Sequence, residues 1–457
     1  MGVLTPIGLT PVLPGDTFRH STTALVRMMP LMAPVMHPIH VTIHHWFVPF
    51  RLLWDNWENF ITGGSDGLSV PTFPTIRAPA VGGFPVGGLM DHLGQSTGVA
   101  NFETSALPAR AMALLYNQCY RDEDLNTPIG FSTADGLDTT TSQDLQNVCW
   151  EKDYYTTSRP WEQKGAEVTL PLVGQAKLKN TAAINSPLGV QNGNNANNQV
   201  YVASSPSDKF YVDGADFDAP DINESRFAYA WQRVLESRAR WGSRYTELLR
   251  AWGVKSSDAR LQRPEYLGGG NQTIQFSEVL GSANNDDTVL GQLGGHGIGA
   301  IKSNTYKSFF EEHGFVVSVA FLRPITLYAQ GSPRHWNYRV REDFWQPEMQ
   351  HIGQQAIKNK EIYAAHPQPD ATFGFQDRFD ENRRNYGVIS GLFKTTLDFW
   401  SAARIFGSAP ALNGDFVKCV PTKDIFAVPS EPGVIIMAKH NIYARRLVAK
   451  VGTSFIR

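Results

Sequence analysis

Histidines gather near the N-terminus of the chain, and histidine is the side chain best suited to bind a transition metal or to exchange a proton near neutral pH. His40, His44 and His45 lie in residues 39–48, and His37 comes just before them. That run alternates apolar and polar residues and so predicts a strand, on which His40 and His44 share one face and His45 points to the other. At most two rings then converge, and no H-E-x-x-H or Cys/His spacing is present. We therefore predict hydrogen-bonded histidines at a subunit interface and no metal ion.

A glycine-rich segment, residues 291–299 (GQLGGHGIG), has the composition of a phosphate-binding loop. It lacks the G-x-x-x-x-G-K-[ST] spacing that places backbone amides and a lysine around phosphates, so we predict a flexible loop instead. No G-x-S-x-G elbow or Cys-His signature is present either. The three cysteines, Cys119, Cys149 and Cys419, include no C-x-x-C pair, which favours free thiols in a reducing cytoplasm. We therefore predict a protein that is not an enzyme, with no catalytic residue, cofactor or metal.

One basic segment combines cations with aromatic rings, a pairing that binds single-stranded nucleic acid through phosphate neutralisation and base stacking. Residues 226–263 carry nine basic and three acidic residues, and residues 227–252 have the apolar spacing of an amphipathic helix. Arg240 and Arg244 stand beside Trp241 in this helix and are candidates for DNA contact. The alternative is that the aromatic rings pack in a core and the arginines form salt bridges at a subunit interface.

The C-terminal tail is a second candidate for DNA contact. Residues 439–457 hold no acidic residue and five basic ones, which are Lys439, Arg445, Arg446, Lys450 and Arg457. Uncompensated positive charge at a terminus is a common arrangement for reaching phosphates. Arg445 and Arg446 are neighbours on a predicted strand and point to opposite faces, so we expect only one of them to reach nucleic acid. The alternatives are salt bridges between subunits or a solvated basic strand.

The elements that position these residues are mainly strands. Runs of β-branched or alternating apolar residues predict strands over residues 16–29, 39–48, 273–276, 315–322 and 434–451. Helices are predicted over residues 51–61, 108–120 and 227–252. Because clear strands lie at both ends of the chain and do not alternate with helices, we predict that strands from opposite ends pair in one antiparallel sandwich. On the second strand, the side chains predicted to face the core are Ile39, Val41, Ile43 and Phe47.

The composition is typical of a β protein with extensive contacts to partner chains. Of the 457 residues, 42% are hydrophobic, 11% are aromatic and only 18% are charged. Few charges with many aromatic and turn-forming residues favour short strands, long loops and surface that is buried against other chains. The net charge of −2 restricts any nucleic-acid contact to local patches. We find neither a signal peptide nor an apolar run of about 18 residues, so we predict no membrane span.

We divide the chain into four segments of one structural domain. Residues 1–62 hold the N-terminal strands and a short helix, residues 63–121 form a loop insertion with a helix, and residues 226–457 hold the basic helix, the remaining strands and the basic tail. Residues 122–225 are an acidic insertion that we predict to face solvent, since residues 122–224 carry sixteen acidic and six basic side chains. Its asparagine-rich middle is predicted to be an exposed tip, with Asn192, Asn194, Asn195, Asn197 and Asn198.

Three long segments of the chain resemble the major capsid protein of the Microviridae, gokushovirus type. They are PGDTFRHSTTALVRMMPLMAPVMHPIHVTIHHWFVPFRLLWDNWENFITGG (14–64), RYTELLRAWGVKSSDARLQRPEYLGG (244–269) and GFVVSVAFLRPITLYAQG (314–331). The order and spacing of these blocks resemble the family over nearly the whole chain, and least in the acidic insertion. Blocks of this length are far more specific than a short motif.

The resemblance implies an eight-stranded antiparallel jelly roll of the viral capsid type, mainly β, with long loop and helical insertions. It implies a T=1 icosahedral shell around a circular single-stranded DNA genome, in a virion whose protein is made in the bacterial cytoplasm. The acidic insertion is the candidate for a protrusion at the three-fold axes that faces a receptor on the host surface, and a small basic internal protein is a further partner on the DNA. The alternative function is a soluble jelly-roll module that binds carbohydrate or protein.

Overall fold

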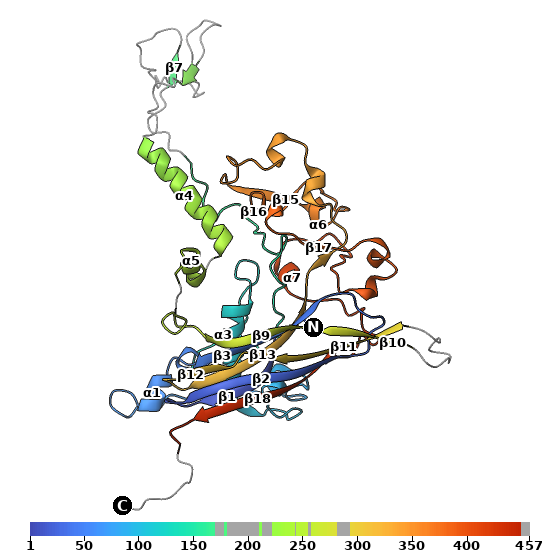
Figure 1. Ribbon diagram of the computed structural model, residues 1–457. Coiled ribbons are helices and arrows are strands. Elements are labelled where there is room, and N and C mark those ends of the chain that lie inside the picture. The colour runs from blue at the N-terminus through green and yellow to red at the C-terminus, as the bar shows by residue number, and fades with distance from the viewer. Residues whose placement is uncertain are drawn as a thin grey trace, which may run out of the picture. The chain divides into compact units, whose positions relative to one another are not determined.

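Two antiparallel β-sheets form the centre of the structure (Figure 1). The computed structural model describes residues 1–169, 178–180, 210–212, 222–242, 244–254, 257–280 and 293–448. Sheet I has the strand order β1 (Thr5–Val12), β13 (Gly314–Pro324), β3 (Ile39–Pro49) and β9 (Glu265–Thr273). Sheet II contains β10 (Gln275–Leu280), β11 (Leu293–Lys302), β2 (Thr17–Met28), β12 (Tyr306–Phe309) and β18 (Val434–Arg445).

Strands from opposite ends of the chain pair in both sheets, as predicted. In sheet II, β18 runs antiparallel beside the whole length of β2, from Val434 opposite Met28 to Arg445 opposite Thr17. In sheet I, β13 lies between β1 and β3 and is antiparallel to both. The prediction of a mainly β protein with antiparallel sheets is therefore confirmed.

The strand β3 places its apolar residues in the core, as its alternation predicts. Ile39, Val41 and Ile43 are at most 1% exposed and pack in one cluster with Val26 of β2 and residues of β11 and β13. Phe47 is 3% exposed and belongs to a second cluster with Phe18 of β2. The core therefore lies between the two sheets, and the predicted burial of this face is confirmed.

The opposite face of β3 is also buried, which the alternation did not predict. Trp46 and Val48 on that face pack against the helix α3 (Leu107–Leu115) in a separate hydrophobic cluster. The helix α3 continues into the π-helical turn η2 (Tyr116–Tyr120). Together the two elements match the helix predicted over residues 108–120. Because β3 is buried on both faces, each of its polar side chains needs a hydrogen-bond partner on a neighbouring element.

The two other predicted helices are interrupted. Residues 51–61 form a 3-10 turn, η1 (Phe50–Leu52), and a short helix, α1 (Trp57–Thr62), which ends at Gly63 with a left-handed φ of 80°. Residues 227–252 form α4 (Ile222–Trp241) and α5 (Tyr245–Ala251). The break between them lies at Gly242, whose φ of 103° is a conformation that favours glycine.

The predicted apolar stripe of the basic helix does not pack in a core. Trp231, Trp241 and Trp252 are 42%, 53% and 66% exposed, and the buried positions of α4 are Leu235, Glu236 and Ala239. The alternative in which these aromatic rings fill a core is therefore wrong for the single chain. Spacing predicted which side chains share a helix face but not which face meets the rest of the protein.

The prediction of a flexible glycine-rich loop over residues 291–299 is wrong, because residues 293–299 belong to β11. This strand pairs with β10 on one side and with β2 on the other. A Cβ at Gly295 would lie 2.3 Å from the carbonyl oxygen of Ala33, and one at Gly297 would lie 2.9 Å from the sulfur of Met28. Glycine is therefore required here for close packing rather than for flexibility.

Smaller elements occupy the long connections between the strands. One three-stranded sheet consists of β5 (Glu103–Ser105), β4 (Thr75–Arg77) and β6 (Leu137–Asp138). Two strand pairs are β14 (Leu327–Tyr328) with β17 (Gly387–Val388) and β15 (Gln354–Lys358) with β16 (Thr372–Asp377). Short helices are α2 (Leu89–His92), α6 (Asn359–Ile362) and α7 (Gly414–Val417). Single 3-10 turns are η4 (Arg334–Asn337), η5 (Arg341–Asp343), η6 (Asp380–Asn382), η7 (Gly391–Lys394) and η8 (Asp398–Trp400).

The chain divides into two compact units. The larger contains residues 1–162 and 240–457, and the smaller contains residues 163–239. In the smaller unit, β7 (Leu178–Asn180) pairs antiparallel with β8 (Phe210–Val212). Most of α4 also belongs to this unit. The five predicted tip asparagines, residues 192–198, lie outside the described residues. No helix within the described ranges is long and apolar enough to cross a membrane.

The first part of the acidic insertion belongs to the larger unit, and some of its carboxylates are buried while others, such as Asp135 and Asp144, are exposed. Asp122, Asp138 and Asp153 are each at most 8% exposed. Asp122 forms ion pairs with Lys152 and Arg159. The excess of acidic residues over 122–224 therefore does not predict exposure in residues 122–162, because several of these carboxylates are individually neutralised.

Candidate functional site

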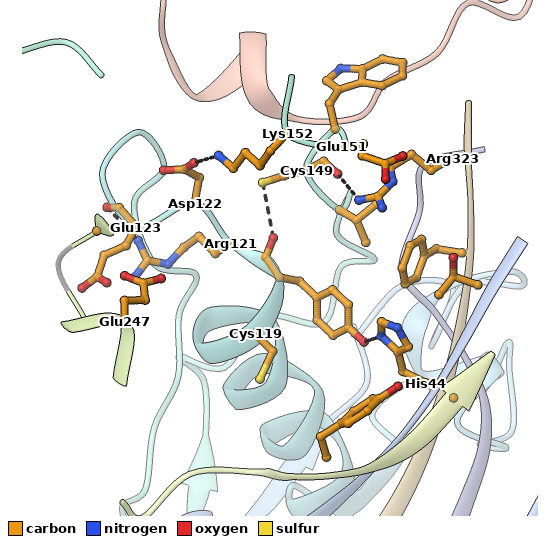
Figure 2. Close-up of a pocket in the computed structure, with 18 of the residues that line it drawn as sticks. His44, Cys119, Arg121, Asp122, Glu123, Cys149, Glu151, Lys152, Glu247 and Arg323 are labelled. Carbon is orange, nitrogen blue, oxygen red and sulfur yellow. Dashed lines mark hydrogen bonds and ion pairs between the residues drawn. The ribbon is translucent and has the colours of Figure 1, made fainter. Parts of the chain in front are cut away.

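A cavity of about 700 Å³ lies in the larger unit beside the strands β3, β9 and β13 (Figure 2). Residues 119–124, which follow α3, and residues 148–152 line its other sides. Its polar lining brings a histidine, two cysteines and several charged side chains together, so it is the place where a catalytic or metal site would be expected.

A hydrogen-bonded group at the base of this cavity holds His44 in place. The Tyr120 hydroxyl lies 2.8 Å from Nδ1 of His44 and accepts a hydrogen bond of 2.9 Å from Nε1 of Trp46. Burial and, to a smaller extent, the nearby Arg323 lower the pKa of His44 to about 4, so the ring is neutral near pH 7. Burial also raises the pKa of Tyr120 well above its usual value. Neither group is suited to exchange a proton near neutral pH.

The two cysteines and Asp122 of the cavity are equally unsuited to acid–base or nucleophilic chemistry near neutral pH. Burial raises the pKa of Cys119 to about 11 and also raises that of Cys149, so both stay thiols rather than nucleophilic thiolates. Burial of Asp122 is outweighed by Lys152 and Arg159, which hold the pKa of that carboxyl at about 2. Among the described residues, no group of three histidine, cysteine, aspartate or glutamate side chains is placed to hold a metal ion.

A second polar group, which we call the histidine cluster, lies between the two sheets and consists of His20, His45 and His440. The rings of His20 and His45 are tilted by 49° to each other with centroids 4.6 Å apart, and Nε2 of His20 lies 3.2 Å from Nδ1 of His440. His45 is hydrogen-bonded to Ser318 at 2.8 Å and to Ser303 at 3.0 Å. His45 is hydrogen-bonded as predicted, but it is fully buried between the two sheets of one chain rather than placed at a subunit interface. Ser318 belongs to β13 of sheet I, and Ser303 directly follows β11 of sheet II.

We expect the histidine cluster to make the subunit sensitive to mild acid. Burial and the neighbouring His440 lower the pKa of His20 to about 4, and burial and the other rings lower that of His45 to about 3. Below pH 6.5 the unfolded chain binds protons on these rings while the folded chain does not. Stability is therefore lost as the pH falls from about 6.5, by on the order of 2 kcal/mol for each ring at pH 5.

The urea midpoints of purified subunits at pH 7 and pH 5 measure this effect. His45→Gln keeps hydrogen-bonding groups near Ser303 and Ser318 but cannot be protonated, so the variant should lose less stability between the two pH values than the unmodified protein. His351→Gln, at an exposed position, should leave the loss unchanged. The same loss in His45→Gln and in the unmodified protein would contradict the expectation.

Three of the predicted DNA-contact residues form ion pairs within the chain. Nε of Arg240 lies 3.0 Å from Asp377, and Arg244 pairs with Glu123 and Glu247 at 3.3 and 3.2 Å. Nε of Arg446 lies 3.3 Å from the fully buried Asp16, and its Nη2 donates to the carbonyl of Pro11. These pairs agree with the salt-bridge alternative for these arginines, with partners in the same chain.

The remaining predicted contact residues divide between the described and undescribed parts of the chain. Lys439 and Arg445 are exposed on β18, and neither has an ion-pair partner among the described residues. Lys450 and Arg457 lie outside the described residues. The structure also places four cations that sequence analysis missed in the same sheet as β18, on β2, β11 and β12, namely Arg19, Arg27, Lys302 and Lys307. Arg19 and Arg27 stand at the outward-facing positions of the alternating pattern in β2. That pattern could have identified them as exposed cations from the sequence.

The chain is similar to known proteins over nearly its whole length. Residues 1–456 match the model of a family described as capsid protein (F protein). Capsid protein VP1 of Bdellovibrio phage phiMH2K is 35% identical over 451 residues, which cover 91% of this chain and 84% of the relative. Capsid protein VP1 of Chlamydia phage 1 is 30% identical over 534 residues, with coverages of 95% and 89%. Capsid protein VP1 of Spiroplasma virus 4 is 28% identical over 471 residues, with coverages of 92% and 85%.

Proposed function

The chain belongs to the capsid protein (F protein) family, and from this membership we propose that its copies assemble into a small T=1 icosahedral shell around a circular single-stranded DNA genome. It is a structural capsid protein of a bacteriophage virion and not an enzyme. The observation that carries the proposal is the match over residues 1–456. The cavity is consistent with it, because the thiols there stay protonated and Asp122 is paired with Lys152 and Arg159.

Negative-stain electron microscopy of the purified protein tests this function. Closed, uniform shells that contain DNA are expected. Small oligomers or monomers would instead favour a soluble carbohydrate- or protein-binding module, an alternative that the family membership does not support.

We further propose that the two sheets form a jelly roll. β11 and β12 pair with successive parts of β2 and so act as one interrupted strand, which gives eight strands in the two sheets. β2 pairs with β18 in sheet II, and β3 pairs with β13 in sheet I. The consecutive strands β2 and β3 thus pair with strands from the other end of the chain, one in each sheet. Such pairing is expected in a jelly roll, in which one long antiparallel pair of chain segments folds over the core so that its two halves lie in different sheets.

We also propose that part of the segment 122–225 forms an outward protrusion near a three-fold axis that contacts a receptor on the bacterial host. Support comes from the asparagine-rich sequence of residues 191–198, whose polar backbone stays hydrated at little cost. Deletion of residues 185–198 is expected to leave shell assembly unchanged and to reduce attachment to host cells. Shell yield by microscopy and phage adsorption measure the two effects. Loss of shells after this deletion would contradict the outward placement.

The shell is proposed to hold its genome through local cations and with the help of a small basic internal protein. Lys439 and Arg445 support a contact from this chain because both are exposed and unpaired among the described residues. Lys450 and Arg457 remain candidates from their sequence alone. Arg240, Arg244 and Arg446 are weaker candidates because each already pairs with a carboxylate of the same chain.

A further inference from the structure

The face of sheet II that points away from the core can be identified from the alternation of β2. Phe18, His20 and Val26 are buried and point inward, whereas Arg19 and Arg27 are exposed and point outward. Residues directly opposite each other in an antiparallel ladder share a face. The register of β2 with its neighbours therefore defines which residues of β11, β12 and β18 lie on this outward face.

Positive side chains from several strands meet on the outward face. Thr23 of β2 lies between Lys439 of β18 and Lys302 of β11. Arg19 lies between Tyr443 of β18 and Lys307 of β12. With Arg27 and Arg445, the face carries six basic residues, which are Arg19, Arg27, Lys302, Lys307, Lys439 and Arg445. Four of them come from parts of the chain that are remote from the basic tail.

Among the described residues, no carboxylate pairs with these cations. The outward positions of β2, β11, β12 and β18 carry no aspartate or glutamate. Within the parts of the chain that the structure describes, none of the six basic side chains has a carboxylate within ion-pair distance. Arg446, the next residue after β18, shows the contrast because it turns to the buried Asp16. The outward face is therefore suited to a polyanion.

Exposed rings and apolar side chains lie between the cations. Tyr443 is 77% exposed opposite Arg19, and Phe309 is 61% exposed opposite Thr17, in the row of Arg445. Met437 is 68% exposed in the next part of β18. Cations that neutralise phosphates together with rings that stack on bases are the combination that binds single-stranded nucleic acid without sequence preference.

We infer that the outward face of sheet II is the surface of the subunit that binds the single-stranded DNA genome. The inference rests on the proposed function and names the part of the chain that contacts the DNA. A second copy of the same face is a poor partner, because a two-fold contact would bring six cations against six cations. Base stacking on Tyr443 and Phe309 requires unpaired bases, which favours single-stranded over double-stranded DNA.

The test replaces three cations on three different strands, as Arg19→Gln, Lys302→Gln and Lys439→Gln in one variant. Binding of a short oligothymidylate to purified subunits is measured by fluorescence anisotropy over a range of salt concentrations. We expect the affinity to fall by on the order of ten-fold or more at low salt. The slope of log affinity against log salt should become shallower by about 2, since each contact with a single strand contributes about 0.7.

Two further variants serve as controls. Arg260→Gln, Arg341→Gln and Lys394→Gln together remove the same charge from exposed positions outside sheet II, and this variant should bind like the unmodified protein. Arg19→Lys, Lys302→Arg and Lys439→Arg together keep the charge of the face, and this variant should keep the salt slope. Urea midpoints of all variants check that the subunits are equally stable.

The outcomes separate this inference from the proposed function. Unchanged DNA binding in a variant that still forms shells would overturn the inference and leave the capsid function intact. Unchanged DNA binding with loss of shells would also overturn it and would identify the face as a contact between copies. Failure of the unmodified protein to form shells would refute the proposed function itself, whatever the binding measurements give.

Discussion

Replacement of Ile43 by aspartate is expected to unfold the subunit and abolish shell assembly. Ile43 is fully buried in β3, in the cluster that both sheets share. It lies between Ala320 of β13 and Gly270 of β9, so neither residue directly opposite it has a side chain that could hydrogen-bond to the new carboxylate. An unpaired charge at such a site costs several kcal/mol, at least ~4 kcal/mol, which is comparable to the whole stability of many domains.

Urea unfolding of the purified subunit and electron microscopy of the assembly reaction measure this loss. Ile43→Val removes one methylene group at the same site and should cost only about 1 kcal/mol, so shells should still form. Val81→Asp introduces the same charge at a position that is 90% exposed and should leave the subunit's stability unchanged. A stability of Ile43→Asp within about 1 kcal/mol of the unmodified protein would show that this face of β3 is not the core.

The strands were predictable from sequence because their signal is local. Ile39, Val41 and Ile43 alternate with more polar residues, and the two ends of the chain carry the clearest runs of this kind. The glycines of β11 gave no such signal. Glycine is needed there because Ala33 and Met28, more than 260 positions away in the sequence, approach the strand closely. The spacing of residues within the segment does not reveal this contact.

The candidate site was predicted only in part, for the same physical reason. Lys439 and Arg445 are exposed, which is compatible both with the predicted DNA contact and with the alternative of a solvated basic strand. Arg446 was grouped with them, but its partner Asp16 comes from the other end of the chain and meets it only after β18 has paired with β2. Arg19 and Lys302 were missed because their shared face exists only once three strands are aligned.

Net charge was the least reliable guide to burial, and the pair formed by Arg110 and Asp138 shows why. Nε of Arg110 in α3 lies 2.7 Å from Oδ2 of Asp138 in β6, and the two side chains are 1% and 0% exposed. Arg110 also donates to the carbonyls of Leu53 and Ala134 at 3.1 and 2.8 Å. A single guanidinium therefore joins α3 to residues 53, 134 and 138. Removing it is expected to have the second large effect.

Arg110→Met is expected to destabilise the subunit by about 3–5 kcal/mol, because the carboxylate of Asp138 is then buried without its counter-charge. Hydrogen bonds from Thr141 and Arg110 lower the pKa of Asp138 despite its burial, so the group is ionised near pH 7 and the lost partner is a charge. In the double variant Arg110→Met with Asp138→Asn, no charge remains to be desolvated, and much of the loss should be recovered. Urea unfolding of the two single variants and the double variant gives the coupling between the residues.

The exposed pair of Arg77 and Glu103 is a matched control for this cycle. Its N···O distance of 2.8 Å is nearly the same, but the two side chains are 50% and 42% exposed. Water solvates either partner when the other is removed, so Arg77→Met should cost less than about 1 kcal/mol. The two pairs then differ in burial rather than in geometry. Equal losses for Arg110→Met and Arg77→Met, or a double variant no more stable than Arg110→Met alone, would show that Asp138 is not held as a buried charge.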